Sequence, residues 1–202
     1  GALGSPVVDP IRRYLRLLRI QFTARRRPRV GLHDVAVTRE RVWLSDLDEL
    51  RHMNNSVYLA LLDHARLDLL LRSGVWPKVR GAGIYPVVTH QTITYRKSLE
   101  LGDRFQIQTR VAGYDDRAVY LEQRFVRDGE IVARAFVAGR FLRERGGVVP
   151  IAELGEVAGV DVSQPDGGLG GGHATPEHAR ARTVRLGGGR LADRDAGGRV
   201  RR

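Results

Sequence analysis

The chain of 202 residues contains no cysteine. Disulfide bonds, cysteine nucleophiles and zinc sites built from thiolates are therefore excluded. The lack of disulfides is consistent with a reducing environment. We expect a cytoplasmic location, with peripheral attachment to a membrane as the alternative.

The sequence also lacks a long uninterrupted apolar run. A helix that crosses a bilayer needs roughly 18 or more consecutive apolar residues, and none is found in this sequence. We therefore expect that the chain as given does not span a membrane.

Positive charge is concentrated near the two ends of the chain. The formal net charge is +11, of which residues 1–30 carry +7, residues 161–202 carry +3 and the long stretch between them only +1. A nucleic-acid-binding domain would carry its positive charge on the folded part. We therefore predict no nucleic-acid partner.

The composition divides the chain into three parts. Residues 32–158 hold enough apolar residues for one core, whereas residues 159–202 are rich in Gly and Arg. Such a tail buries too little apolar surface to offset its ordering entropy, so we predict that it is disordered. Its glycine runs do not join a strand to a helix and are poor candidates for phosphate loops.

Residues 1–31 are predicted to hold a basic amphipathic helix. Apolar residues recur at helical spacing on one face, and arginines occupy the other; the apolar set is Ile11, Tyr14, Leu15, Leu18 and Phe22. Two interpretations are open. Residues 11–29 lie in an anionic membrane surface, or the apolar stripe packs on the sheet of the protein and the arginines are solvated.

A second helix, long and apolar, is predicted from Val57 to Ser73, directly after a polar cluster at residues 46–55. Asn54 or Asn55 is a suitable N-cap, and Gly74 a suitable stop. The polar cluster therefore lies at the positive end of the helix dipole, where a negative charge is stabilised.

The remaining pattern is that of strands. Residues 32–44 precede the long helix, and four further runs follow it, at 84–98, 104–113, 117–127 and 131–142. Residues 75–83 are predicted to be a connecting loop, residues 150–157 a short helix, and Asp128-Gly129 a hairpin turn. The predicted fold class is α+β, with one long helix wrapped by a curved antiparallel sheet.

Residues 46–59 resemble the signature of the hotdog-fold acyl-CoA thioesterases of the 4-hydroxybenzoyl-CoA thioesterase type. Within that family the chain is most similar to thioesterase superfamily member six. The resemblance continues through residues 96–99, 105–111 and 115–126 and covers about residues 33–145. One departure is Ser98, where several relatives have proline.

This resemblance implies a helix enclosed by a five- or six-stranded sheet, and a homodimer or higher oligomer with active sites between subunits. The second acid of the motif, Asp48, would attack the thioester carbonyl or activate water. The backbone amide at Asn55 would polarise the carbonyl oxygen. The substrate would be an acyl-CoA or an acyl carrier protein, and no metal or cofactor is required.

The other candidates have structural alternatives. Substrate contact is considered for His52, Asn54, Tyr58, Asp63, Arg96 and Lys97. The asparagines are first of all helix caps, Tyr58 is at a position typical of the core, and Asp63 needs a hydrogen-bond partner if it is buried. Arg96 and Lys97 either meet the phosphates of coenzyme A or are simply solvated. Asp46 is the acid more suited to a structural role.

Two other functions remain open. A hydratase or dehydratase of acyl thioesters shares the fold, but the spacing of Asp48 and His52 is wrong for it and no Asn-Pro pair is present. A non-catalytic acyl-binding or membrane-associated module would keep the fold without turnover, since fold does not imply function.

Overall fold

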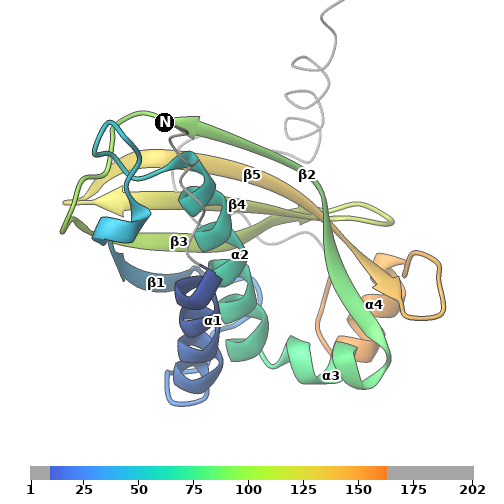
Figure 1. Cartoon of the computed structure of the whole chain (residues 1–202). Helices are drawn as coiled ribbons and strands as arrows, with labels where there is room; N and C mark the ends of the chain where they lie inside the picture. The colour runs from blue at the N-terminus through green and yellow to red at the C-terminus, as the bar shows by residue number, and fades with distance from the viewer. Residues whose placement is uncertain (1–9, 163–202) are drawn as a thin grey trace, which may run out of the picture.

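The computed structural model describes residues 10–162, and the predicted disordered tail lies almost entirely outside them. One five-stranded antiparallel sheet curls around the long helix α2 (Asn55–Arg72), as Figure 1 shows. The strands are β1 (Ala36–Arg41), β2 (Ile84–Tyr95), β3 (Arg104–Tyr114), β4 (Val119–Arg127) and β5 (Glu130–Arg143), in the spatial order β1-β3-β4-β5-β2. The predicted α+β hotdog fold is confirmed.

The core lies between α2 and the concave face of the sheet. Leu61 and Leu62 of α2 are completely buried, and they belong to the same apolar cluster as Phe105, Ile107 and Phe125 from the strands. Because successive strand residues point to opposite faces, the alternation read from β3 and β4 supplies this inner face.

The connection after α2 differs from the prediction. Residues 75–81 form a short helix, α3 (Val75–Gly81), rather than a loop. Pro77 is compatible with it because the first turn of a helix has no intrahelical partners for its N–H groups. Gly74 takes a left-handed conformation (φ 78°) and separates α2 from α3, so the predicted stop after α2 is confirmed.

The hairpin between β4 and β5 follows the prediction. Asp128 and Gly129 both have positive φ, 51° and 81°, which is the conformation of the tight turn that suits the twist of two antiparallel strands. After β5 the chain folds back into α4 (Ile151–Ala158), which packs near α3.

Strand β2 forms one edge of the sheet and has twelve residues. It pairs with β5 through a bulge between Val88 and His90, and no strand among residues 10–162 pairs with its other side. Val88 is about half exposed. A long uncovered edge of this kind is a template for pairing with another strand.

Helix α1 (Pro10–Ala24) packs beside α2. One interpretation of the sequence required its apolar stripe to face the sheet. Among residues 14–24 the buried side chains are Ile20 and Ala24, whereas Tyr14, Leu15, Leu18 and Phe22 are exposed; the side chain of Ile11 lies outside the described ones. The interpretation in which this apolar stripe packs on the sheet is therefore wrong.

Arginines occupy the inner side of the helical segment instead. Arg16 pairs with Asp46, Arg19 with Glu40, and Arg27, just after the helix, with Asp68 of α2. All three carboxylates are buried. Since a buried charge needs a partner, these ion pairs set the orientation of α1.

The convex face of the sheet holds a buried carboxylate, Glu122, among three arginines. Its neighbour Gln123 bonds the carbonyl of Leu62 in α2, so Glu122 points to the other face. Arg110 and Arg124 donate to it at 2.7 and 2.9 Å, and Arg134 also pairs with it. Burial alone would raise the pKa of Glu122, but the hydrogen bonds from Arg124 and Arg110 outweigh burial and hold this pKa below its usual range.

We predict that Glu122→Gln lowers the free energy of unfolding by about 2 kcal/mol at neutral pH, because three arginines lose their shared anion. Since the pKa of Glu122 is lower in the folded state, its contribution is present above the unfolded pKa and is lost as pH falls through the folded value. The difference between variant and wild type should therefore shrink in acid. Urea unfolding across a pH series measures it.

The matched control is Glu130→Gln, which removes the exposed pair with Lys97. Exposed pairs contribute little, so this variant should unfold like the wild type. Equal stability of the Glu122 and Glu130 variants would contradict a stabilising role for the buried cluster.

Candidate active site

The loop before α2 is folded back on itself like a small hairpin. Asp48 donates its backbone N–H to the carbonyl of His52 at 2.8 Å, and Asn54 donates to the carbonyl of Asp46 at 2.8 Å. A bridge between Leu47 and Met53 lies between these two bonds. Because a strand rises about 3.3 Å per residue, the backbone of Asp48 lies roughly 7 Å from the N-cap of α2.

The carboxylate of Asp48 is held by the backbone of its own loop. Its Oδ1 accepts N–H bonds from Leu50 at 2.9 Å and from His52 at 3.2 Å. Arg51 between them has a left-handed conformation, with φ 64°. Asp48 is half-buried, and no hydrogen bond to its Oδ2 is found among residues 10–162. One carboxylate oxygen is thus fixed while the other is available.

The start of α2 provides an amide without an acceptor. Asn54 is the N-cap, and its Oδ1 accepts from the N–H and the hydroxyl of Ser56 at 2.9 and 2.7 Å. No acceptor for the N–H of Asn55, the first helical residue, lies within residues 10–162. The first N–H groups of a helix carry about half a positive charge in total, so Asn55 offers a donor to an anion.

Asp46 lies at the base of the same loop and has a structural role. Its Oδ2 accepts from Arg16 at 2.7 Å and from the backbone N–H of Trp43 at 3.0 Å. Trp43 leads into a 3-10 turn, η1 (Leu44–Asp46). The side chain is almost completely buried, so Asp46 links α1 to the start of the loop.

Tyr58 is part of the core. It is 2% exposed and packs against Tyr95 and Phe125, with ring centroids 5.0 and 4.9 Å away. Burial raises the pKa of Tyr58 to about 12. Within one protomer its ring is therefore a packing group.

The remaining loop and strand-end residues lie near the surface. The backbone of His52 pairs with Glu100, and its imidazole makes no hydrogen bond among the described residues. Arg96 and Lys97 follow β2 and are exposed; Lys97 pairs with Glu130. These two cations do not converge on Asp48 through any bond in the part of the chain that the structure describes.

Asp63 is not the buried acid of α2. Its side chain is 54% exposed and pairs with Arg66, whose Nη1 donates to Gln123 Oε1 at 2.5 Å. Burial lowers the pKa of Arg66, and the nearby Asp63 carboxylate opposes this shift. The acid that is buried completely is Asp68, held by Arg27 and Arg72 at 2.9 and 3.1 Å.

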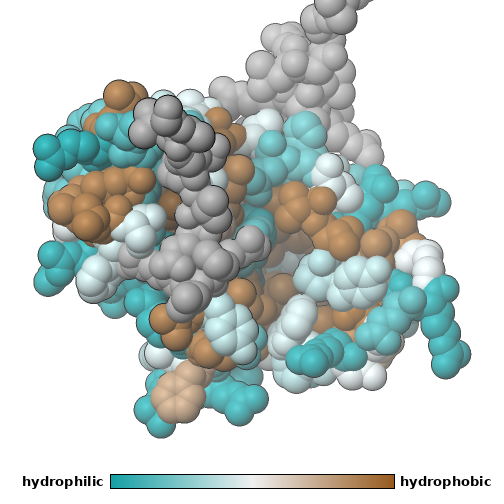
Figure 2. Space-filling model, in the orientation of Figure 1, coloured by the Kyte–Doolittle hydropathy of each residue, from teal (hydrophilic) through white to brown (hydrophobic). Residues whose placement is uncertain are grey.

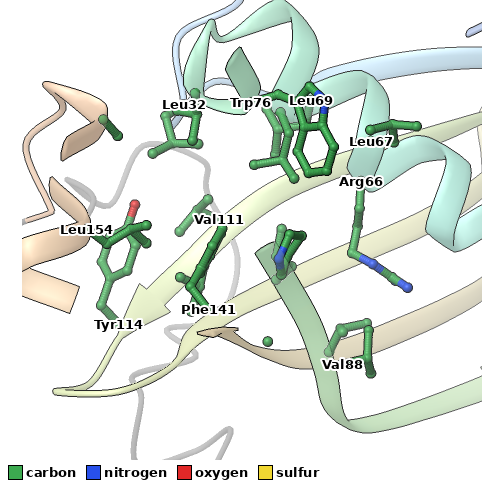
Figure 3. Close-up of a pocket in the computed structure, with 18 of the residues that line it drawn as sticks. Leu32, Arg66, Leu67, Leu69, Trp76, Val88, Val111, Tyr114, Phe141 and Leu154 are labelled. Carbon is green, nitrogen blue, oxygen red and sulfur yellow. The ribbon is translucent and has the colours of Figure 1, made fainter. Parts of the chain in front are cut away.

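A cavity of about 230 Å³ lies between the second half of α2, the sheet, α3 and α4. Its lining is almost entirely apolar. Figure 3 shows Tyr114 and Leu154 at one end and Arg66 and Val88 at the other. Tyr114 and Leu154 are buried, and Tyr114 bonds His33 at 2.7 Å, whereas Asp63 and Val88 are about half exposed. The closed end is therefore at Tyr114 and the mouth at Asp63.

The cavity mouth and Asp48 lie at different places along α2. Asp63 and Arg66 are 8 and 11 residues after Asn55, which corresponds to about 12 and 16 Å of helix. Sequence reasoning missed the cavity and Arg66, because neither the convergence of α3 and α4 nor the Gln123 contact has a local signal.

Residues 10–162 contain neither a candidate metal site nor a candidate membrane-spanning helix. No cluster of three or more metal-binding side chains occurs there. No helix in the same residues has the length and apolar character needed to cross a bilayer.

Comparison with known proteins identifies the family. The model of the thioesterase-like superfamily matches residues 42–157, more than half of the chain. The chain belongs to the thioesterase-like superfamily. The match begins at the end of β1 and continues into α4, so it includes the Asp48 loop and all of α2.

Individual members of this superfamily are also similar. The protein THEM6 of Xenopus laevis is 48% identical over 81 residues, covering 40% of this chain and 39% of that protein. The protein THEM6 of Danio rerio is 43% identical over 99 residues, 48% of this chain and 49% of that protein. The matched chain thus spans half or less of the length of these relatives.

Among solved structures, the probable thioesterase YbaW of Escherichia coli superposes with a TM-score of 0.59 at 26% identity. The superposition covers 63% of this chain and 99% of YbaW. The resemblance to thioesterases that residues 46–59 indicate is therefore confirmed.

The geometry of the loop predicts how two substitutions of Asp48 differ. Asp48→Ala removes the acceptor of two backbone N–H groups and should lower the free energy of unfolding by about 1 kcal/mol. Asp48→Asn keeps an acceptor oxygen and should change it much less. Urea denaturation of both variants tests this, and equal stability of the two would contradict the hydrogen bonds described for Oδ1.

Proposed function

We propose that the chain hydrolyses an acyl thioester, either an acyl-CoA or an acyl carrier protein, to a free acid and a thiol. Membership of the thioesterase-like superfamily supports the reaction class. The observation that carries the assignment to a site is the pairing of a fixed carboxylate, Asp48, with the open amide of Asn55 at the start of α2.

The chemistry uses both groups. Attack on the carbonyl carbon forms a C–O bond and leaves a negative oxygen, which the Asn55 amide and the helix dipole stabilise. The Oδ2 of Asp48 either removes a proton from the attacking water or attacks directly. The C–S bond then breaks. If Asp48 acts as the base, the leaving sulfur takes the proton that Asp48 removed from water. If Asp48 attacks directly, the thiolate takes a proton from solvent, and water hydrolyses the acyl–Asp48 anhydride, which releases the acid and restores the carboxylate. Because thioesters are already activated, no metal is needed.

The acyl group has a candidate site in the apolar cavity. Cavities of about 150 Å³ with apolar linings hold benzene, so about 230 Å³ accommodates a somewhat larger group such as a medium-length alkyl chain. The charged pair Asp63–Arg66 lies at the mouth, where the polar part of the substrate would remain.

A homodimer would make this use of the cavity possible. If the open edge of β2 pairs antiparallel with β2 of a second copy, the two-fold axis places the two α2 helices antiparallel on the same face of a continuous sheet. The start of one α2 then lies toward the second half of the other. The Asp48 loop of one protomer would thereby serve the cavity of its partner.

The remaining sequence candidates have supporting roles in this proposal. His52 and Asn54 shape the loop, Tyr58 supports the first turn of α2, and Arg96 and Lys97 are exposed cations that suit the phosphates of coenzyme A. Residues 11–29 are proposed to contact a membrane peripherally.

We predict that Asp48→Asn lowers kcat/KM for acyl-CoA hydrolysis by about a hundredfold or more, because it removes the proton acceptor or nucleophile. A free-thiol assay over a panel of acyl-CoA chain lengths measures it. Glu49→Gln, which alters the adjacent exposed acid, is the matched control and should retain activity. Undiminished turnover by Asp48→Asn would refute the assignment.

The same panel separates the alternatives. Addition of water to an enoyl-CoA would indicate a hydratase, and saturable acyl-CoA binding without thiol release would indicate a non-catalytic module. Either result from the wild-type protein would replace the proposed hydrolysis.

We predict that Gly139→Leu shortens the acyl chains that are accepted. Gly139 lines the cavity, and a Cβ there would lie 3.6 Å from the nearest atom, an ordinary contact. The added isobutyl group occupies space that an acyl chain would fill. Each buried methylene contributes about 0.8 kcal/mol, so kcat/KM should fall at least tenfold for long chains and little for acetyl-CoA. Ala138→Leu, on the other face of β5, is the control.

Mixing two variants tests the shared site. A heterodimer of Asp48→Asn and Gly139→Leu would contain one site with both changes and one site with neither. Long-chain activity should therefore reappear when the two proteins are unfolded and refolded together. If it does not, although heterodimers form, the acid and the cavity do not belong to a site shared between protomers.

A further inference from the structure

The outer side of α1 carries an apolar stripe that nothing covers among residues 14–162. Tyr14, Leu15, Leu18 and Phe22 are 62%, 57%, 44% and 60% exposed. With 3.6 residues per turn, these four residues occupy an arc of roughly 100°. Soluble surfaces usually expose large apolar residues singly, and a contiguous group marks an interaction site.

The stripe points directly away from the protein. Arg16, Ile20 and Ala24, which face the protein, lie roughly opposite it around the helix axis. The ion pairs Arg16–Asp46 and Arg19–Glu40 prevent the helix from turning over, because turning would leave buried carboxylates without these arginines. These ion pairs therefore keep the stripe exposed in the folded protein.

The surroundings of the stripe are positively charged. Residues 10–33 contain eight arginines and no acid. Arg25, Arg26 and Arg29 are exposed and take part in no ion pair within residues 10–162. Arg26 lies over the ring of Phe22, 4.2 Å from its centroid. Exposed cations thus border the apolar residues.

A second exposed apolar group adjoins α1. Trp43 and Leu44 are 50% and 74% exposed. The backbone N–H of Trp43 and the guanidinium of Arg16 bond the same oxygen of Asp46, so this segment is next to the helix. In Figure 2, hydrophobic side chains are visible over α1 and over the segment that holds η1, on one face of the molecule.

We propose that this face, the docking face, made by the stripe of α1 with Trp43 and Leu44, binds the surface of an anionic lipid bilayer. The chemistry matches such a surface: aliphatic and Phe side chains enter the acyl boundary, Trp and Tyr suit the interface, and the bordering arginines meet lipid phosphates. A second protein would need a complementary acidic and apolar groove, whereas a bilayer supplies both chemistries to a helix that lies flat.

Docking would place the proposed active site at the membrane. Asp46, which α1 holds directly, is two residues before Asp48. Long-chain acyl thioesters are amphiphiles that partition into bilayers, so substrate would be delivered close to the Asp48 loop. This consequence rests on the proposed hydrolysis, whereas the docking itself does not.

Co-sedimentation of the full chain with vesicles tests the docking. We expect binding to vesicles of equal amounts of phosphatidylglycerol and phosphatidylcholine, and much weaker binding to pure phosphatidylcholine. Leu18→Ser with Phe22→Ser should weaken binding at least tenfold. Arg25→Ser with Arg26→Ser should weaken it about twenty-fivefold, since each cation near an anionic surface contributes about fivefold, and high salt should have a similar effect.

The controls are a polar substitution on α1 outside the stripe and the loss of two arginines elsewhere. Gln21→Ser alters α1 beside the stripe, and Arg80→Ser with Arg145→Ser removes two exposed arginines from other parts of the molecule; both should bind like the wild type. The proposal is overturned if the wild type does not sediment, if pure phosphatidylcholine binds equally, or if the control variants lose as much binding as the stripe variants.

Two further measurements keep this result separate from the proposed hydrolysis. Turnover of a short-chain, water-soluble acyl-CoA without vesicles should be unchanged in the stripe variants, because α1 does not line the cavity or the Asp48 loop. Loss of vesicle binding with intact turnover would refute docking alone. If Leu18→Ser with Phe22→Ser instead lowers the oligomeric state in gel filtration, the stripe is a protein interface and the proposal fails.

Discussion

The position of the loop before α2 depends on one buried carboxylate, that of Asp46. Its side chain binds Arg16 of α1 and the backbone of Trp43, and its carbonyl accepts the N–H of Asn54, the residue that caps α2. Three parts of the chain therefore meet at one residue. The cost of burying this charge is offset only when all of them are in place, and the loop that carries Asp48 is fixed as a result.

The residues that form the core are different from the groups proposed to act on the thioester. The inner face of the sheet and α2 bury aliphatic and aromatic side chains, with Gln123 as a polar link between Arg66, Thr109 and the carbonyl of Leu62. The groups proposed to act on a substrate are one backbone amide, that of Asn55, and one carboxylate held by backbone amides, that of Asp48. Such groups lose little freedom when a transition state forms, which is the requirement for electrostatic stabilisation.

Much of the fold could be predicted from the sequence because its signals are local. The apolar periodicity of α2, the alternation in β3 and β4 and the Asp128-Gly129 turn each depend on near neighbours. Helix α3 was missed because Pro77 and two glycines suggest a loop, although a first-turn proline is compatible with a helix. The orientation of α1 could not be predicted, since it depends on carboxylates 21, 30 and 41 residues away from their arginines.

The candidate site was predictable only in part. Asp48, Asn54 and Asn55 stand together in the sequence and remain together in the structure. The exposure of Asp63, the complete burial of Asp68 and the cavity beside Arg66 depend on how α1, α3 and α4 pack around α2, which no local pattern records.

The arginines of the N-terminal segment that face the protein contribute to the stability of the rest of the chain. Arg16, Arg19 and Arg27 act as counter-ions for buried carboxylates. A chain shortened to begin at residue 32 would keep Glu40, Asp46 and Asp68 but lose the arginine that each of them receives from this segment. Solubility and yield should therefore drop when the first 31 residues are removed, even though the whole family match lies beyond them.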